Sequence, residues 1–199
     1  MKIGIIIGSS RKNSQSERIG YFLNDLISKI DEQIECEMFK ISELDVPLWN
    51  EGMWEKESNI KTLWKPINDK LKTCDSFIVI SPEWAGMATP HLKNFLLMAN
   101  EGSLDYKSAL LVGISSGMGG AYPIAELRMS GYKNNHIWWM PEHLIFRFVE
   151  NLFNGENSEI DNELTKRSEA VLKLLINTTK AMKPVIENIG DLKDFPYGM

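Results

Sequence analysis

Short apolar runs alternate along the chain with longer segments of mixed polarity. The apolar runs span residues 2–7, 34–39, 76–81, 109–115 and 136–140. Two of them, SFIVIS at 76–81 and ALLVGIS at 109–115, are almost continuously apolar, which predicts strands that are buried on both faces. Strands of this kind occur in parallel sheets that carry helices on each side.

The segments between these runs predict helices. We place the helices at residues 16–30, 58–72, 90–100, 121–130 and 162–182. Pro90 suits a first helical turn, Gly131 suits a helix end, and Pro184 is expected to end the last helix. The stretch 40–55 is expected to be irregular. Right-handed crossovers between parallel strands then give a doubly wound, three-layer α/β sandwich.

Composition narrows the class of protein. For 199 residues, 43% of them hydrophobic and 25% charged, we expect one soluble domain over 1–199, with a flexible tail at 187–199. The net charge of −5 and the lack of a Lys/Arg cluster argue against a nucleic-acid partner. Cys36 and Cys74 lack CxxC spacing, so neither a disulfide framework nor a metal site is expected. The first strand leaves no room for a signal peptide, and no apolar run reaches membrane-spanning length, so we expect a cytoplasmic protein with no membrane partner.

The first strand ends in a loop that is rich in hydrogen-bond donors. The loop reads GSSRKNSQS over residues 8–16, and a helical pattern follows it. The free N–H groups of a first helical turn and the aligned peptide dipoles favour an anion here. Ser9, Ser14 and Ser16 add hydroxyl donors. Because Arg11 adds a permanent cation that grips phosphate with two donors, we interpret this segment as a phosphate-binding loop.

The spacing within this loop limits what it binds. It lacks the Gly-x4-Gly-Lys-Ser/Thr pattern of a P-loop, which disfavours a nucleoside triphosphate with magnesium. It also lacks the Gly-x-Gly-x-x-Gly dinucleotide fingerprint. Hydroxyls with one arginine suit a terminal phosphate monoester better than a buried pyrophosphate. The alternative is that Ser14 and Ser16 only cap a helix.

Two further loops follow predicted strands. The second loop, residues 81–90, reads SPEWAGMATP, and the third, residues 115–121, reads SSGMGGA. Ligands of open parallel sheets bind beyond the carboxyl ends of the strands, where all three loops are expected to meet. The glycines allow close backbone approach to a flat ligand, and Trp84 offers an aromatic face. We therefore predict a site for a planar ring with a phosphate tail. Taken separately, the prolines and glycines also suit tight turns, and Trp84 also suits a packing residue.

Three motifs occur in this order along the chain. They are Gly8-Ser9-Ser10-Arg11-x-x-Ser14, then Pro82-Glu83-Trp84 with Pro90-x-Leu92-Lys93-Asn94, then Ser116-Gly117-x-Gly119-Gly120 with Leu127-Arg128. Together they closely resemble the NADPH-dependent FMN reductase family. The resemblance implies a flavodoxin-like fold with a five-stranded parallel sheet in the order 2-1-3-4-5. It also implies FMN as cofactor, NADPH or NADH as hydride donor, and a small-molecule electron acceptor, such as a flavin, quinone, azo dye or metal oxyanion.

The resemblance also assigns a role to each loop. The FMN phosphate is expected to lie against Ser9, Arg11, Ser14 and Ser16. The isoalloxazine ring is expected to lie against Pro82, Glu83, Trp84, Ala85 and Gly86, with its other edge at Ser115, Ser116, Gly117, Gly119 and Gly120. The chain departs from the family at Trp84 and Ala85, where tyrosine and asparagine are usual. An indole and a methyl group make this wall less polar, which favours flat aromatic acceptors over small charged oxyanions.

A flavin carries the hydride chemistry itself, so no catalytic acid–base side chain is expected. We expect an FMN-dependent NAD(P)H oxidoreductase with ping-pong kinetics. The alternatives are a flavodoxin-type electron carrier and a non-enzymatic flavin-binding module. The resemblance further implies a homodimer or homotetramer. The aromatic residues of 40–55, with Trp138 and Trp139, exceed what one small core needs, although burial within a single subunit is the alternative.

Overall fold

The computed structural model describes residues 1–99, 102–155 and 158–190 of the chain. The strands are β1 (Lys2–Ile7), β2 (Glu35–Lys40), β3 (Ser76–Pro82), β4 (Ser108–Ile114) and β5 (Trp138–Phe146). The helices are α1 (Gln15–Ile30), α2 (Asn59–Lys72), α3 (Pro90–Met98), α4 (Ala121–Ser130) and α5 (Glu159–Glu187), with short 3-10 turns η1 (Glu51–Trp54) and η2 (Val149–Asn151).

The five strands form one parallel sheet. Its strand order is β2-β1-β3-β4-β5, as expected for a flavodoxin-like protein. The register aligns Ile5 of β1 with Ile78 of β3, and Val79 of β3 with Leu111 of β4. Strand β1 therefore neighbours both β2 and β3, and the direction of winding reverses beside it. This reversal creates the edge at which ligands of such sheets bind.

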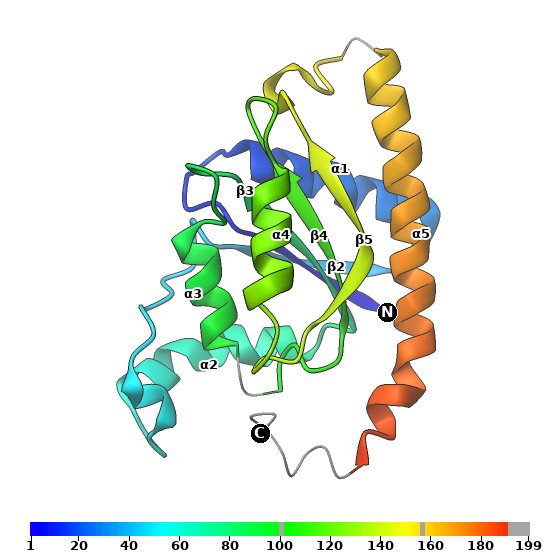
Figure 1. The fold of residues 1–199 in the computed structure, drawn as a ribbon. Helices are drawn as coiled ribbons and strands as arrows, with labels where there is room; N and C mark the ends of the chain where they lie inside the picture. Colours follow the sequence, from blue (N-terminus) through cyan, green and yellow to red (C-terminus); the bar gives the residue numbers. More distant parts are fainter. Residues whose placement is uncertain (100–101, 156–157, 191–199) are drawn as a thin grey trace.

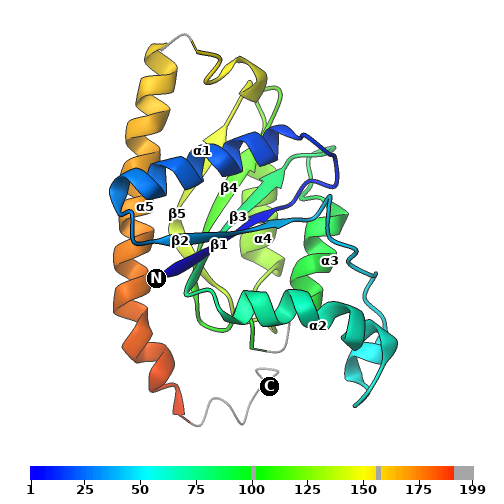
Figure 2. The same ribbon diagram turned by 180° about the vertical axis from the view of Figure 1, so that it is seen from behind.

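Helices cover both faces of the sheet, as Figures 1 and 2 show from opposite sides. Helices α1 and α5 lie on one face, where they bury Leu23 and Leu172 against β1, β3 and β4. Helices α2, α3 and α4 lie on the other face, where Trp64 and Phe95 pack edge to face with ring centroids 5.2 Å apart. The central strands β3 and β4 are buried along their whole length, which explains their continuous apolar sequences.

Side-chain caps fix where several helices begin. The hydroxyls of Ser14, Ser58 and Ser158 each accept a hydrogen bond from a backbone N–H in the first turn of α1, α2 and α5. Thr89 caps α3 in the same way, and Pro90 occupies its first turn as expected. The observed helix starts agree with the predicted ones to within three residues.

Two predicted boundaries were wrong. Pro184 does not end α5, which runs on to Glu187, and the Asn188 N–H closes the last turn by donating to the Pro184 carbonyl at 3.2 Å. Strand β5 runs on to Phe146 rather than stopping at 140. It is an edge strand, and its register shifts opposite the step from Ala109 to Leu111, which accommodates Pro141.

Other expectations fall near segments that are not described. Helix α3 was expected to reach residue 100, but its last helical residue is Met98, and 100 itself lies outside the described residues. Of the expected tail at 187–199, Glu187 is helical, and residues 191–199 lie outside the described part of the chain. None of the described helices combines the length and apolar character needed to cross a membrane. The stretch 40–55 is irregular as expected, apart from η1.

Candidate functional site

Three loops follow β1, β3 and β4 and meet at one end of the sheet, toward the top of Figure 1. We call this region the carboxyl edge and define it as residues 8–16, 82–90 and 115–120. Hydrogen bonds join the loops to one another. The Gly8 N–H donates to the Ile80 carbonyl at 2.8 Å, and the Thr89 hydroxyl donates to the Gly8 carbonyl at 2.5 Å. The first loop is therefore fixed against β3 and against the end of the second loop.

The first loop keeps several donors available for an anion. Ser14 caps α1 by accepting from the Glu17 N–H. Among the described residues, its hydroxyl hydrogen and the N–H groups of Gln15 and Ser16 have no recorded acceptor and can donate to an anion. Ser9 likewise accepts from the Arg11 N–H at 3.2 Å. Ser9, Ser14 and Ser16 are buried, whereas the Arg11 side chain is exposed. Ser14 therefore does cap α1, and this role is compatible with phosphate binding because the hydroxyl still has its own hydrogen to donate.

Close packing explains the glycine that begins this loop. A Cβ atom at Gly8 would come within 2.6 Å of the Ile80 carbonyl oxygen and 2.8 Å of a Leu92 methyl carbon. Only a residue without a side chain permits this approach, so the chain can turn directly from β1 toward the N-terminus of α1. The loop backbone is thereby held at the positive end of the α1 dipole.

The second loop forms a tight hairpin. Trp84 and Met87 exchange backbone hydrogen bonds of 3.0 and 2.9 Å, and Ala85 and Gly86 turn between them with φ of 49° and 74°. Two successive positive φ values define a type I′ turn, which asparagine and glycine favour. Ala85 therefore adopts a left-handed conformation that costs an alanine about 1–2 kcal/mol. Trp84 is half-buried at the base of the turn, and Pro82 is buried at the end of β3.

The third loop is fastened to the second by a carboxylate. The Glu83 side chain accepts the Gly120 N–H at 2.5 Å, at the N-terminus of α4. A Cβ at Gly119 would come within 2.5 Å of the same carboxylate. Gly120 has a φ of 99°, and its carbonyl oxygen would lie 2.2 Å from a Cβ at Gly113. Three glycines are thus needed for the loops to approach one another.

Serines complete the third loop. The Ser115 hydroxyl accepts from the Gly117 N–H at 3.2 Å, and the Ser116 hydroxyl donates to the Glu150 carboxylate at 3.3 Å. Ser116 is exposed, and Ser115 and Gly117 are partly buried. The structure therefore brings every residue of the predicted site to the carboxyl edge, on loops that interlock through their own hydrogen bonds.

The sequence of the chain matches a known protein family. A family model described as NADPH-dependent FMN reductase matches residues 1–150 of the chain. The chain belongs to this family. The FMN-dependent NADPH-azoreductase of Staphylococcus aureus is 30% identical over 130 residues, which are 65% of this chain and 68% of that enzyme. Like other members, this FMN reductase family protein is an oxidoreductase that depends on FMN and takes electrons from NAD(P)H, as the sequence predicted.

Solved structures share the fold. FerB, a flavoenzyme NAD(P)H:(acceptor) oxidoreductase from Paracoccus denitrificans, aligns with a TM-score of 0.67 and 20% identity over 90% of this chain and 97% of its own. An azoreductase from Bacillus anthracis aligns with a TM-score of 0.62 and 11% identity over 85% and 97%. At such low identities, these matches support the flavodoxin-like fold of this chain rather than any one substrate.

The carboxyl edge fits the cofactor on which the family depends. FMN combines a phosphate monoester with a flat ring. The first loop offers hydroxyls, helix N–H groups and the Arg11 guanidinium, all suited to a phosphate. The other two loops approach each other so closely that Gly119 has no room for a side chain, which leaves its backbone accessible to a flat ring. The second loop also carries the half-buried Trp84. Polar and apolar parts of the edge thus match the two parts of the cofactor.

Several residues of the edge were missed by sequence reasoning. Glu126 of α4 accepts the Ala88 N–H at 2.7 Å and binds Lys93 at 2.6 Å, which fixes the second loop between α3 and α4. The hydrogen bond from Lys93 lowers the pKa of the Glu126 carboxyl below its usual value. Tyr122 is exposed and lies beside Gly86. These contacts join residues 33 to 38 positions apart, which no local pattern reveals.

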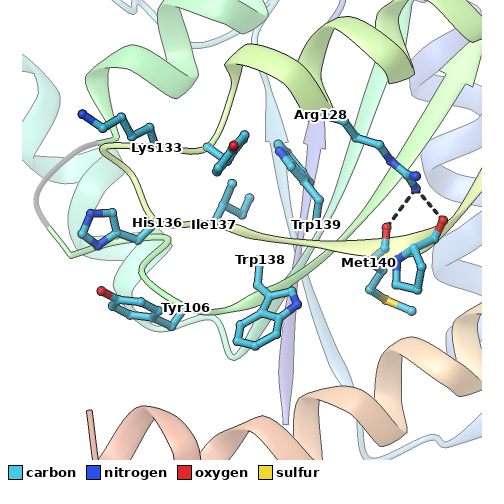
Figure 3. A pocket seen from close by; sticks show the side chains of 10 residues that line it. Tyr106, Arg128, Lys133, His136, Ile137, Trp138, Trp139 and Met140 are labelled. Carbon is cyan, nitrogen blue, oxygen red and sulfur yellow. Dashed lines mark hydrogen bonds between the residues drawn. The ribbon is translucent and has the colours of Figure 1, made fainter. Parts of the chain in front are cut away.

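A separate cavity lies at the opposite end of the sheet (Figure 3). We call it the aromatic pocket. It has a volume of about 590 Å³ and is lined by Tyr106, Arg128, Tyr132, Lys133, His136, Ile137, Trp138, Trp139, Met140 and Pro141. The Arg128 guanidinium is used within the fold. It donates to the carbonyls of Met140 and Pro141 and so stabilises the irregular part of β5.

The histidines do not enter the predicted site. His91 is exposed on α3, and His136 belongs to the aromatic pocket. Burial lowers the pKa of His143, on β5, and the nearby Arg128 and Arg167 lower it further. No group of three or more His, Cys, Asp and Glu side chains in the described part of the chain is arranged to hold a metal ion.

Proposed function

We propose that the carboxyl edge binds FMN and that the enzyme passes electrons from NAD(P)H to a flat aromatic acceptor in alternating, ping-pong half-reactions. The observation that carries the proposal is the interlocking of three loops at successive strand ends, with an anion-binding helix start on the first and close-packed glycines on the third. The family supplies the cofactor and the reaction class. The residues and the acceptor are our own assignment.

Each loop has one task in this assignment. Ser9, Ser14, Ser16 and the Arg11 guanidinium bind the phosphate through hydroxyl, backbone and charged donors. The segment 82–86 forms one wall of the ring site, in which Trp84 supplies apolar surface and Glu83 fixes the wall to the third loop. Ser115, Ser116, Gly117, Gly119 and Gly120 border the other edge of the ring.

Bound FMN supplies the redox chemistry, because its ring accepts a hydride from NAD(P)H and passes the electrons on. The protein must hold the ring, leave one face open and bring donor or acceptor to about 3–3.5 Å from it. Backbone N–H groups of the third loop are suited to stabilise negative charge at the edge of the ring. No proton-transferring side chain is required.

Exposed apolar side chains around the edge favour an aromatic acceptor. Met87, Met118, Tyr122 and Phe148 are all at least 46% exposed, and they come from the second loop, the third loop, α4 and the segment after β5. Thioethers and aromatic rings contact flat π-systems favourably. Quinones, azo dyes and free flavins therefore suit this surface better than small charged oxyanions.

We also propose that residues 1–199 act as a single domain in the cytoplasm, and as a homodimer or homotetramer. Cys36 and Cys74 are free thiols, in keeping with a reducing compartment. Trp54 is 69% exposed and Trp138 is 48% exposed, which supports a second subunit covering them. Trp64, by contrast, is buried in the core of one subunit. Light scattering at micromolar concentration tests this point, and a clean monomer would contradict it.

Anaerobic stopped-flow mixing tests the enzymatic function. The FMN-loaded protein should lose its yellow colour rapidly with excess NADPH or NADH and regain it when a quinone is added. An electron carrier would bleach only with a reducing partner, and a non-enzymatic flavin-binding module would not bleach at all. A panel of quinones, azo dyes, free flavins and chromate then identifies the acceptor, and faster turnover of chromate than of any aromatic compound would overturn our assignment of acceptor class.

A further inference from the structure

The segment that follows β5 runs along the outer side of the third loop. The Arg147 Nε–H donates to the carbonyl of Met118 at 2.7 Å and to that of Gly119 at 3.1 Å. The neighbouring Phe148 N–H donates to the carbonyl of Gly117 at 3.0 Å. Two successive residues therefore bind three successive carbonyl oxygens of the loop.

The orientation of these carbonyls fixes the orientation of the N–H groups. No cis peptide occurs in the described residues, and in a trans peptide the C=O and the N–H of the next residue point in opposite directions. With the carbonyls of 117–119 directed at Arg147 and Phe148, the N–H groups of Met118, Gly119 and Gly120 must point to the inner side. The Gly120 N–H confirms this, because it donates to Glu83 on the second loop.

Two of these three donors keep no acceptor. Among the described residues, neither the Met118 N–H nor the Gly119 N–H takes part in a recorded hydrogen bond. Successive N–H groups that point the same way form a concave site for negative charge. Because the guanidinium sits at the carbonyl ends of two of these peptides, it also polarises their N–H groups and makes them stronger donors.

We propose that Arg147 is a positioning residue for flavin binding and reduction. It does not contact the cofactor. Together with the Phe148 N–H, it holds the peptides 117–118 and 118–119 so that the N–H groups of Met118 and Gly119 face the isoalloxazine ring, while its bond to the Gly119 carbonyl keeps the Gly120 N–H on Glu83. This inference rests on the proposed function, since it requires the ring to lie between the second and third loops. Reduction adds negative charge to the ring, so aligned N–H donors stabilise reduced FMN more than oxidised FMN.

A contact through the ring predicts a distinctive pattern of affinities. Arg147→Gln removes the charge and the shared Nε–H bond. It should weaken binding of oxidised FMN and of riboflavin by the same factor, about fivefold, because riboflavin has the ring but lacks the phosphate. Arg147→Lys keeps the charge and should recover part of the loss. Arg167→Gln, on the exposed side of α5, removes the same charge from a remote ion pair with Glu142 and serves as the control.

The reduction potential supplies a second readout that does not depend on turnover. If reduced FMN loses about tenfold more affinity than oxidised FMN, the two-electron midpoint potential of Arg147→Gln falls by about 30 mV. Urea unfolding of the apo-proteins should show little difference between Arg147→Gln and the Arg167→Gln control, because Arg147 is exposed.

The experiment is therefore a titration of FMN and riboflavin, with a potential measurement, on wild type and the three variants. Equal weakening of both ligands together with a lower potential supports the proposal. Weakening of FMN alone would assign Arg147 to the phosphate and overturn it, as would unchanged affinities and potential. If the wild-type protein binds neither ligand, the proposed function itself fails, which separates the two conclusions.

Discussion

The two ends of the sheet differ in what makes them suitable for a ligand. The carboxyl edge consists of backbone, hydroxyls and glycines, joined by short hydrogen bonds between loops far apart in the sequence. The aromatic pocket at the other end is a hollow of about 590 Å³ with rings on its walls, and its one arginine is used to stabilise β5. The aromatic pocket is a cavity, whereas the carboxyl edge presents hydrogen-bond donors that point in defined directions.

This difference shows that a cavity alone is weak evidence for a redox site. FMN is bound through a charged phosphate and a polar ring edge, so its site needs donors aimed at defined places. The carboxyl edge has such donors, and family membership agrees with them. Trp138 and Tyr132 of the aromatic pocket are exposed, as the proposed subunit contact would require.

The largest expected effect concerns the glycines of the third loop. Gly120→Ala should destabilise the protein by about 2–4 kcal/mol, because φ is 99° and the new Cβ would come within 2.6 Å of Ile145. The matched control is Gly117→Ala, where no atom lies within 4 Å of a new Cβ. Urea unfolding should show the difference, and equal stability of the two variants would mean that the loop is packed differently.

The second prediction concerns the phosphate. Arg11→Ala should weaken FMN binding about ten- to a hundredfold, since a charge-assisted hydrogen bond contributes about 1.5–3 kcal/mol, and it should leave unfolding almost unchanged. Riboflavin binding should not respond. Lys133→Ala removes the same charge from the aromatic pocket and should not alter FMN affinity. A fluorescence titration measures both affinities. A larger loss of FMN affinity in Lys133→Ala than in Arg11→Ala would place the phosphate at the aromatic pocket and contradict our assignment to the carboxyl edge.

The third prediction uses the tryptophans of the two regions. FMN near an indole quenches its emission, so Trp84→Ala should remove a large part of the quenching caused by FMN, while Trp138→Ala should leave the fractional quenching nearly intact. Trp84→Ala should also slow quinone turnover more than flavin reduction. Were Trp84→Ala to change neither quenching nor turnover, Trp84 would be a packing residue and the second loop would not border the ring.

The sequence predicted the framework of the carboxyl edge because its signals are local. Apolar runs predicted the strands, Pro90 marked the start of α3, and the order of elements placed the three loops together. It did not reveal Arg147 or Glu126. Each binds a partner about 30 positions away along the chain, and in the sequence alone neither differs from an ordinary charged surface residue. The continuation of β5 beyond 140 was missed because Pro141 disfavours a strand, except at an edge.

Local strain in the second loop gives a smaller effect. Ala85 adopts a φ of 49°, so Ala85→Gly should stabilise the protein by about 0.5–1 kcal/mol, and Ala85→Asn should also be favourable because asparagine tolerates this conformation. Ala121→Gly, in the first turn of α4, is the control and should destabilise slightly. Thermal unfolding measures both. A lower melting temperature for Ala85→Gly would contradict the assigned turn.

The smallest predicted effects are changes in stability at two carboxyl groups whose pKa values are shifted in opposite directions. At the carboxyl edge, the folded pKa of Glu126 is lowered by its hydrogen bond to Lys93, so Glu126→Gln should cost about 1 kcal/mol at pH 7. The cost should shrink as the pH falls below the ordinary carboxyl pKa and disappear once the pH passes the lowered pKa of the folded state. Near the aromatic pocket, burial raises the pKa of Asp105, so ionisation there destabilises the fold. Asp105→Asn should therefore stabilise the protein slightly at pH 7, by under about 1 kcal/mol, and lose this gain in acid. Urea unfolding at pH 4 and pH 7 measures both, and the same sign for the two variants would contradict this account.

The central claim is that FMN binds at the carboxyl edge and not in the aromatic pocket. Amide chemical shifts of the isotope-labelled apo-protein, followed during FMN titration, test it residue by residue. The largest changes should fall on residues 9–16, 83–87 and 115–120, with little change at 132–141. Riboflavin should reproduce the changes in the second and third loops but not those around Arg11. Dominant changes at 132–141, with the three loops unaffected, would contradict the claim.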